Sequence, residues 1–140
     1  MEAEQTVASV PLFSSLDRRT IERLDKQGKR RVYAAGDPII RQDAPASALY
    51  VILRGKVRVH EGGEDGETIG QLYAGDFFGE LALIEDHPRT ASVTAIEETE
   101  CVLFVAWEFT ALLKEYPEMA TPIMNALIER LHRREHHLGS

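Results

Sequence analysis

The sequence predicts a mainly β domain with helices on either side. Apolar and polar residues alternate at period two between residues 29 and 105, as they do in half-buried strands. Turn-forming glycines recur through the same stretch, and helical patterns precede and follow it. Many short strands with regular turns indicate a barrel or a jelly-roll-like sandwich. We therefore expect an N-terminal arm (residues 1–13) and one domain (14–140), with the β region at 29–105 and helices at 106–137.

The first helix is expected directly after the arm, which we interpret as loosely held. Ser14 and Asp17 have the spacing of a capping box, with Asp in place of the usual Glu. Apolar residues then recur at helical spacing, and Gly28 stands where it would end the helix. The face predicted to be buried comprises Leu16, Thr20, Ile21 and Leu24.

Two matching turns are expected within the β region. The pairs Gly36-Asp37 and Gly75-Asp76 each follow a short step of tyrosine and alanine. Glycine and aspartate are both favoured in tight turns. We therefore interpret the two pairs as equivalent corners of a β-roll.

A buried strand and a hairpin are expected between these corners. Residues 49–53 are apolar and predict a buried strand, which Gly55 ends as a turn. Val57 and Val59 then alternate with charged residues. Residues 61–67 combine glycines with carboxylates and are interpreted as a solvated hairpin loop.

Helical periodicity returns after Val105. Residues 107–116 are predicted to form a short helix that Pro117 closes, and a second helix is expected from about residue 118 toward residue 137. Pro122 lies either in the first turn of that helix or at a joint between two helices. The apolar stripe of the second helix comprises Ile123, Leu127 and Leu131.

Composition and charge narrow the classes of function. The 140 residues are 44% hydrophobic and 28% charged, which is typical of one domain with a real core. A net charge of −7 argues against a broad electrostatic hold on nucleic acid. No apolar run could cross a bilayer, and the N-terminus lacks a secretory signal pattern, so a cytoplasmic protein is expected. The lone cysteine, Cys101, predicts a small buried side chain and no disulfide or zinc site.

Residues 78–92, which we call the cassette, carry the most specific chemistry. Gly79 lets a ligand approach the backbone closely, and the apolar run after it can form a helical turn whose first N–H groups favour an anion. Arg89 offers a planar fork of donors that matches phosphate oxygens, and Thr90 adds a hydroxyl. Glu80 repels phosphate but can accept hydrogen bonds from a sugar hydroxyl. The cassette therefore suits a small anionic ligand with both a phosphate and a sugar.

Taken singly, these residues also fit a purely structural interpretation. An Arg and a Glu nine residues apart are often a surface ion pair worth under about 1 kcal/mol. The whole string is more specific, because it resembles the phosphate-binding cassette of cyclic-nucleotide-binding domains. That pattern runs Phe-Gly-Glu, four apolar residues, a short variable stretch, then Arg, a small residue and Ala, and every position is filled here. The resemblance covers roughly residues 12–135.

The resemblance implies a β-roll, which is a jelly-roll-like double-stranded β-helix, with an embedded phosphate-binding helix and C-terminal lid helices. It implies cyclic AMP or cyclic GMP as ligand, with no cofactor, metal or catalytic residue. The implied ribose contacts are Gly79 and Glu80. The implied phosphate contacts are Leu81, Ala82, Arg89, Thr90 and Ala91. The implied base contacts are Val59, Leu72 and Phe78, with Arg130 and Arg134 from the lid.

The base and the lid leave alternatives open. Thr90 resembles cyclic-GMP-responsive members, yet many cyclic-AMP binders carry a small hydroxyl there; cyclic AMP is the favoured ligand. Arg130 and Arg134 share a helix face and either contact the base or belong to a solvated charged face. His132 and His136 have a spacing seen in metal sites, but we interpret them as part of an exposed terminus.

Functions other than a nucleotide sensor are less well matched. A cupin-like metalloenzyme needs a close His-x-His pair with further ligands, whereas the β region holds only His60 and His87, so no enzyme is expected. A degenerate docking module would have lost Arg89 or Glu80, and both are present. Direct DNA binding would need a helix-turn-helix after the lid, for which the residues up to Ser140 leave no room. We expect a regulatory module whose C-terminal helix contacts an effector protein or a second copy in a homodimer.

Overall fold

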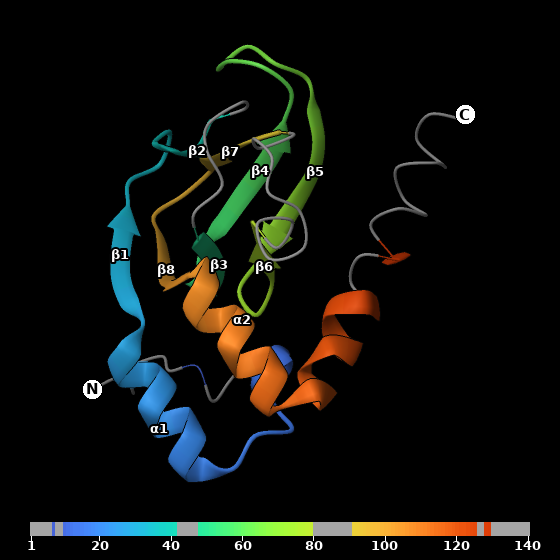
Figure 1. The fold of residues 1–140 in the computed structure, drawn as a ribbon. Helices are drawn as coiled ribbons and strands as arrows, with labels where there is room; N and C mark the ends of the chain where they lie inside the picture. The colour runs from blue at the N-terminus through green and yellow to red at the C-terminus, as the bar shows by residue number, and fades with distance from the viewer. Residues whose placement is uncertain (1–6, 8–9, 42–47, 80–90, 126–127, 130–140) are drawn as a thin grey trace.

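Two antiparallel sheets form the centre of the fold (Figure 1). The computed structural model describes residues 7, 10–41, 48–79, 91–125 and 128–129. The first sheet has the order β1-β8-β3-β6, and its strands are β1 (Lys29–Tyr33), β8 (Thr99–Val105), β3 (Ala48–Arg54) and β6 (Phe77–Phe78). The second has the order β2-β7-β4-β5, and its strands are β2 (Pro38–Ile40), β7 (Ser92–Ala95), β4 (Lys56–His60) and β5 (Thr68–Tyr73). The predicted mainly β fold is confirmed.

The two Gly-Asp pairs make the same turn at two corners. At the first, Asp37 Oδ2 accepts a hydrogen bond from the Ala34 N–H at 2.9 Å. At the second, Asp76 Oδ2 accepts one from the Tyr73 N–H, also at 2.9 Å. In both, the aspartate N–H in turn donates to the carbonyl of that same earlier residue. Each aspartate therefore closes its own turn from both sides, as Asp does in tight turns.

The glycine of each corner is hydrogen-bonded to a strand that is distant in sequence. Gly36 and Gly75 have φ angles of +89° and +95°, which residues with a Cβ rarely adopt. The Gly36 N–H donates to the Ala95 carbonyl on β7, and the Gly75 N–H donates to the Ile52 carbonyl on β3, both at 2.8 Å. The N–H groups of Ala95 and Ile52 return a bond of 2.9 Å to the carbonyl of the corner aspartate. The prediction of equivalent corners is confirmed.

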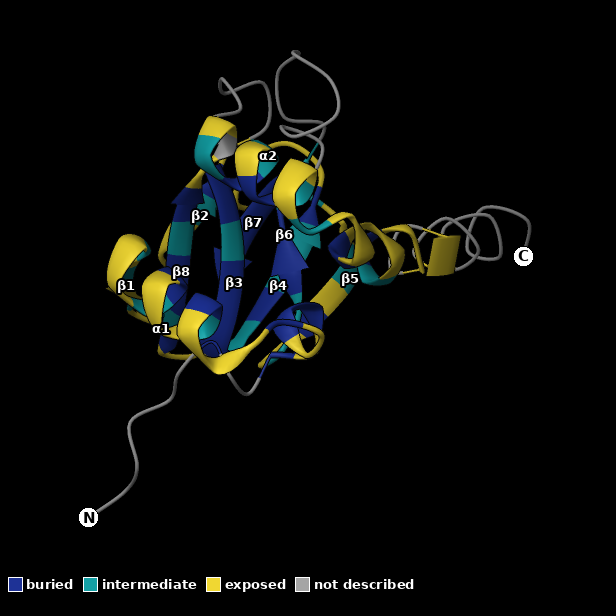
Figure 2. Cartoon of the chain, turned by 60° about the horizontal axis from the view of Figure 1, so that its bottom comes forward, coloured by how far each residue is buried: buried dark blue, intermediate teal, exposed yellow. Residues whose placement is uncertain are grey.

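Buried residues, dark blue in Figure 2, lie on strands of both sheets. They form two apolar clusters that hold the sheets and helices together. The inter-sheet cluster draws on both sheets and comprises Ile40, Ile52, Val57, Leu72, Phe78, Val93 and Cys101. The helix-side cluster lies between the first sheet and the helices, with the rings of Phe13, Phe104 and Phe109 at its centre. Their centroids lie 5.9 to 6.2 Å apart. Strand β8 serves both clusters, because successive side chains of a strand point to opposite faces.

The N-terminal region is packed more closely than expected. A 3-10 turn, η2 (Pro11–Phe13), precedes the first helix. The buried side chains of this region are Val7, Val10, Leu12 and Phe13. All of them belong to the helix-side cluster. The expectation of a loosely held arm is wrong for these residues, because they cover apolar surface of the first sheet.

The first helix, α1 (Arg18–Gln27), is capped by Asp17 and not by Ser14. Asp17 Oδ1 accepts a hydrogen bond from the Thr20 N–H at 2.8 Å. Hydrogen bonding from Thr20 lowers the pKa of the Asp17 carboxyl below its usual value. Ser14 instead ends the preceding turn, where its N–H donates to Pro11. The predicted capping box is therefore wrong, and Leu16 is buried just ahead of the helix rather than on its face.

Gly28 ends α1 as predicted, but for a different physical reason. Its N–H donates to the Leu24 carbonyl at 2.9 Å, while its φ of −72° is one that any residue adopts. A Cβ on Gly28 would lie only 2.9 Å from the Phe104 ring. Glycine is needed here because the chain passes close to β8, not because of a left-handed backbone.

The C-terminal helices follow β8 without a loop. The helix α2 (Ala106–Glu115) and the 3-10 turn η4 (Pro117–Met119) are followed by helical residues 120–125. The predicted short helix closed by Pro117 is confirmed, and Pro122 lies in the first turn of the next stretch. Ile123 is buried, whereas Leu127 and Leu131 lie outside the described residues. Among the helices described, none has the length and apolar character needed to span a membrane.

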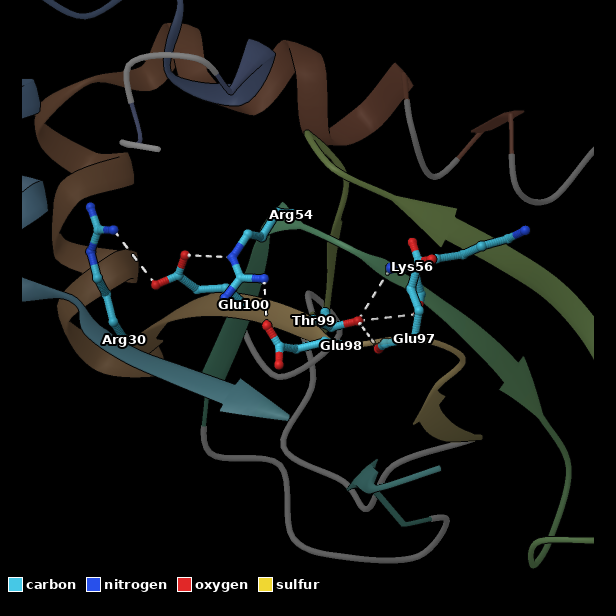
Figure 3. Close-up of polar contacts among 7 residues, drawn as sticks. All are labelled: Arg30, Arg54, Lys56, Glu97, Glu98, Thr99 and Glu100. Carbon is cyan, nitrogen blue, oxygen red and sulfur yellow. Dashed lines mark hydrogen bonds and ion pairs between the residues drawn. The ribbon is translucent and has the colours of Figure 1, made fainter. Parts of the chain in front are cut away.

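A polar network fastens the two sheets where β4 and β8 begin (Figure 3). Thr99 is fully buried, and its Oγ1 accepts a bond from the Lys56 N–H at 3.2 Å. The same oxygen lies 3.2 Å and 2.8 Å from the carbonyls of Lys56 and Glu97. Beside it, Arg54 donates from Nη1 to Glu98 at 2.8 Å and from Nε to Glu100 at 3.3 Å. Thr99, the first residue of β8, is thus hydrogen-bonded to Lys56, the first residue of β4 in the other sheet.

Candidate functional site

The two ends of the cassette lie on different sheets. Phe78 ends β6 at the edge of the first sheet, and Ser92 begins β7 inside the second sheet. Residues 80–90 between these ends lie outside the described residues. The cassette therefore bridges the two sheets that enclose the inter-sheet cluster.

The start of the cassette is fixed by an aromatic pair. The rings of Phe78 and Tyr50 stack with centroids 4.9 Å apart and an interplanar angle of 6°. The two residues are also Cα partners in the β3–β6 pairing. Gly79 follows with φ of +85°, where any side chain would strain the backbone. The close approach expected at Gly79 therefore coincides with a backbone conformation that requires glycine.

The end of the cassette enters a fully paired strand. Ala91 is half-buried, and all four residues of β7 are buried between β2 and β4. Ser92 Oγ donates to the Gly62 carbonyl at 2.6 Å, which ties this point to the hairpin loop. His60, the Cα partner of Ser92, is buried with Nε2 2.7 Å from Thr94 Oγ1. This end is held by strand pairing and by polar contacts together.

The three strand residues predicted to contact the base lie in one place. Val59, Leu72 and Phe78 belong to the inter-sheet cluster or pack against it, from β4, β5 and β6. Leu72 and Phe78 are buried, whereas Val59 is half-buried and pairs with Gly70 on β5. A Cβ on Gly70 would meet no atom within 4 Å. The structure thus brings these residues together as an apolar wall with room beside Val59.

Many predicted ligand contacts lie outside the residues that the structure describes. For the ribose and phosphate these are Glu80, Leu81, Ala82, Arg89 and Thr90. For the base they are Arg130 and Arg134. The roles given to them stay predictions from the sequence.

Two features of the site do not follow from the sequence. The sequence predicts Tyr50 only as part of a buried strand, and it assigns no role to Gly70. The alternation in residues 49–53 could have indicated that Tyr50 points to the opposite face from Leu49 and Val51, but not that it meets Phe78. Gly70 does not indicate a ligand site by its own sequence context. Its role becomes visible only when its strand partner is known to be Val59.

The charge around the site is arranged to keep carboxylates in solvent. Glu61, Glu64 and Asp65 are exposed on the hairpin loop, as predicted. Arg58 donates from Nη1 to the Gly66 carbonyl at 3.1 Å and to Thr68 Oγ1 at 3.0 Å, so it closes this loop. Within the described ranges, no three His, Cys, Asp or Glu residues are grouped to hold a metal ion. The carboxylates of the hairpin are thus in solvent, whereas Leu72 and Phe78 of the apolar wall are buried.

Comparison with known proteins identifies the family. Residues 30–116 match the family described as the cyclic nucleotide-binding domain. The chain is 34% identical over 124 residues to the cyclic AMP receptor protein of Thermus thermophilus, covering 86% of this chain and 57% of that protein. It is 34% identical over 126 residues to a cyclic nucleotide-gated potassium channel of Rhizobium etli, covering 90% of this chain and 34% of the channel.

A solved structure agrees with this assignment. The crystal structure of the Thermus thermophilus catabolite activator protein superposes with a TM-score of 0.76 at 31% identity, covering 92% of this chain and 62% of that one. The chain thus spans from about a third to three fifths of the length of these relatives. The family match extends over more than half of the sequence and includes the whole cassette. The chain belongs to the cyclic nucleotide-binding domain family.

Proposed function

We propose that this chain binds a cyclic nucleotide, with cyclic AMP favoured over cyclic GMP, as a regulatory module. One observation carries the proposal: the cassette sequence is complete, its described ends lie on the two sheets, and its first residue, Phe78, forms an apolar wall with Val59 and Leu72. A purine needs such a wall, and a cyclic phosphate needs the donors that the cassette supplies. The Thermus thermophilus relative is a cyclic AMP receptor protein, which supports the preference for adenine.

Each part of the ligand has assigned residues in this proposal. The ribose lies at Gly79 and Glu80, where the carboxylate accepts a hydrogen bond from the 2′-hydroxyl. The phosphate is held by Arg89 and Thr90, with backbone N–H groups of Leu81, Ala82 and Ala91. The net charge of −7 makes this local concentration of donors necessary, because the protein as a whole repels anions.

The first test is calorimetric titration of cyclic AMP and cyclic GMP into nucleotide-free protein. Arg89→Ala should weaken binding by two or more orders of magnitude (~3 kcal/mol), because it removes a charge-assisted hydrogen bond to phosphate in a desolvated site. Arg19→Ala, which removes an exposed arginine from α1, is the matched control and should bind as the unchanged protein does.

Either outcome is informative about the class of function. If neither nucleotide gives heat or raises the unfolding temperature, the sensor function is wrong, and a docking module without nucleotide becomes the leading interpretation. If both bind and Arg19→Ala weakens them as much as Arg89→Ala, the phosphate does not lie at the cassette.

The proposed output is a rearrangement of the C-terminal helix. A ligand shifts a helix only if it binds one of its positions more tightly. The exposed side chains of Met124 and Ile128, at 58% and 49%, support contact of this helix with an effector or a second copy. Amide NMR signals of residues 118–137 should therefore move when nucleotide is added. Unchanged signals at saturating nucleotide would contradict this output.

A further inference from the structure

We propose that Tyr50 is a positioning residue that holds the ribose side of the nucleotide site through its ring stack with Phe78. The inference rests on the proposed function, since the ribose is assigned to Gly79 and Glu80. Tyr50 lies on β3, away from the cassette in sequence, and acts on the ligand only through the start of the cassette.

The two ends of the cassette are held very unequally. β7, at the far end, has four residues and two neighbouring strands, β2 and β4. β6, at the near end, has two residues, and among the strands described here it has one neighbour, β3. The Cα partners in that short pairing are Tyr50–Phe78 and Val51–Phe77. The Gly75-Asp76 corner holds the chain to Ile52 just before this pairing. The side-chain contacts of Phe77 and Phe78 add to these backbone bonds in fixing the near end.

The ring stack is suited to fix the direction in which the chain leaves β6. Phe77 and Phe78 are 5% and 3% exposed, and they enter the helix-side and inter-sheet clusters respectively. The Phe78 ring lies almost parallel to that of Tyr50, at 4.9 Å. Aromatic pairs contribute beyond the area they bury, and a parallel pair restricts rotation of both rings. Gly79, one peptide further on, is held at a φ of +85° by this anchored strand end.

Removal of the Tyr50 ring should therefore affect one part of the ligand selectively. Phe78 would lose its stacking partner, and the backbone at Gly79 would gain freedom. Ala91 and Ser92 would stay in place, since they depend on β7 pairing and on the Ser92–Gly62 bond. The ribose interaction should weaken, and the phosphate interaction should not. The base wall should also be retained, because Phe78 stays paired with β3 and buried in the inter-sheet cluster.

The test compares cyclic AMP with 2′-deoxy cyclic AMP, which lacks the ribose hydroxyl, by titration into the unchanged protein and its variants. Tyr50→Leu should lower the affinity for cyclic AMP by roughly three- to tenfold, the scale of one aromatic pair. Its affinity for the 2′-deoxy ligand should fall by less than about twofold, because that ligand makes no ribose hydroxyl interaction to weaken. Tyr50→Phe keeps the ring and should bind both ligands as the unchanged protein does.

Ile39→Ala is the control, because Ile39 also packs half-buried against the inter-sheet cluster but lies on β2, in the other sheet from Tyr50. It should leave the ratio of the two affinities unchanged. Urea unfolding of every variant separates an effect on stability from an effect on binding. If Tyr50→Leu does not fold, Tyr50→Met fills a similar volume without a ring and takes its place.

The failure of this inference can be told from the failure of the proposed function. If the unchanged protein binds neither ligand, both are overturned. If it binds cyclic AMP, an equal loss of affinity for both ligands in Tyr50→Leu, or the same selective loss in Ile39→Ala, overturns the role of Tyr50 alone. A loss of affinity in Tyr50→Phe would assign the effect to the hydroxyl and overturn the stacking mechanism.

Discussion

Burial makes the thiol of Cys101 an unusually weak acid. Its side chain is fully buried on β8 in the inter-sheet cluster, and this burial, with a smaller contribution from Glu100, raises the pKa of the thiol to about 12. The thiolate is the reactive form. Thiol reagents should therefore label the folded protein very slowly at about pH 8, and labelling should rise with urea along the unfolding curve. Because the chain has one cysteine, each labelled molecule reports this site alone.

The same shift fixes the sign of a pH effect on stability. The folded pKa lies above the ordinary value of 9.0, so the folded state holds its proton more tightly than the unfolded state does. This contribution is complete below pH 9 and falls away as the pH rises toward 12. Cys101→Ala should flatten the fall in unfolding free energy over this window. Rapid labelling of the folded protein in native buffer would contradict both expectations.

At the scale of elements, the two corners should contribute equally to stability. Asp37 and Asp76 accept the same backbone hydrogen bond at the same distance of 2.9 Å. Replacing either by Ala should lower the free energy of unfolding by about 0.5–1.5 kcal/mol, the range of an ordinary hydrogen bond, because both bonds are exposed to solvent. The double variant should show the sum, because each aspartate bonds within its own turn. Urea denaturation provides the measurement.

Two controls test whether the corner aspartates act through this bond. Asn keeps an acceptor at the same position, so Asp→Asn should cost less than Asp→Ala at each corner. Asp65→Ala removes an exposed carboxylate from the hairpin loop and should leave stability within about 0.5 kcal/mol. A large loss of stability at one corner and none at the other would contradict the prediction that the two corners contribute equally.

At the scale of the whole molecule, polar contacts join the first helix to the C-terminal helices. Thr20 Oγ1 lies 2.9 Å from the hydroxyl of Tyr116, the C-cap residue of α2. Tyr116→Phe should lower the free energy of unfolding by about 1 kcal/mol, because it leaves the buried Thr20 hydroxyl without this partner. A double-mutant cycle with Thr20→Val should show that the two effects are not additive. Strictly additive effects would mean that the hydrogen bond contributes nothing.

Short stretches of sequence are enough to predict the local features: the Gly-Asp corners, the change to a helix after Val105, and the cassette motif. Each depends on a few adjacent residues whose backbone preferences act without help from distant parts of the chain. The family assignment also came from such a string, and the fold it implied is the one observed.

How distant segments meet depends on the folded structure and not on local sequence. Periodicity marks which face of a segment is apolar but not what covers it, so the burial of Val7 and Val10 in the helix-side cluster could not be foreseen. Asp17 caps α1 because Ser14 already belongs to the preceding turn. The stack of Tyr50 on Phe78 likewise depends on the register between β3 and β6. Register and packing arise from contacts between residues far apart in sequence, and these are determined by the global arrangement of the strands.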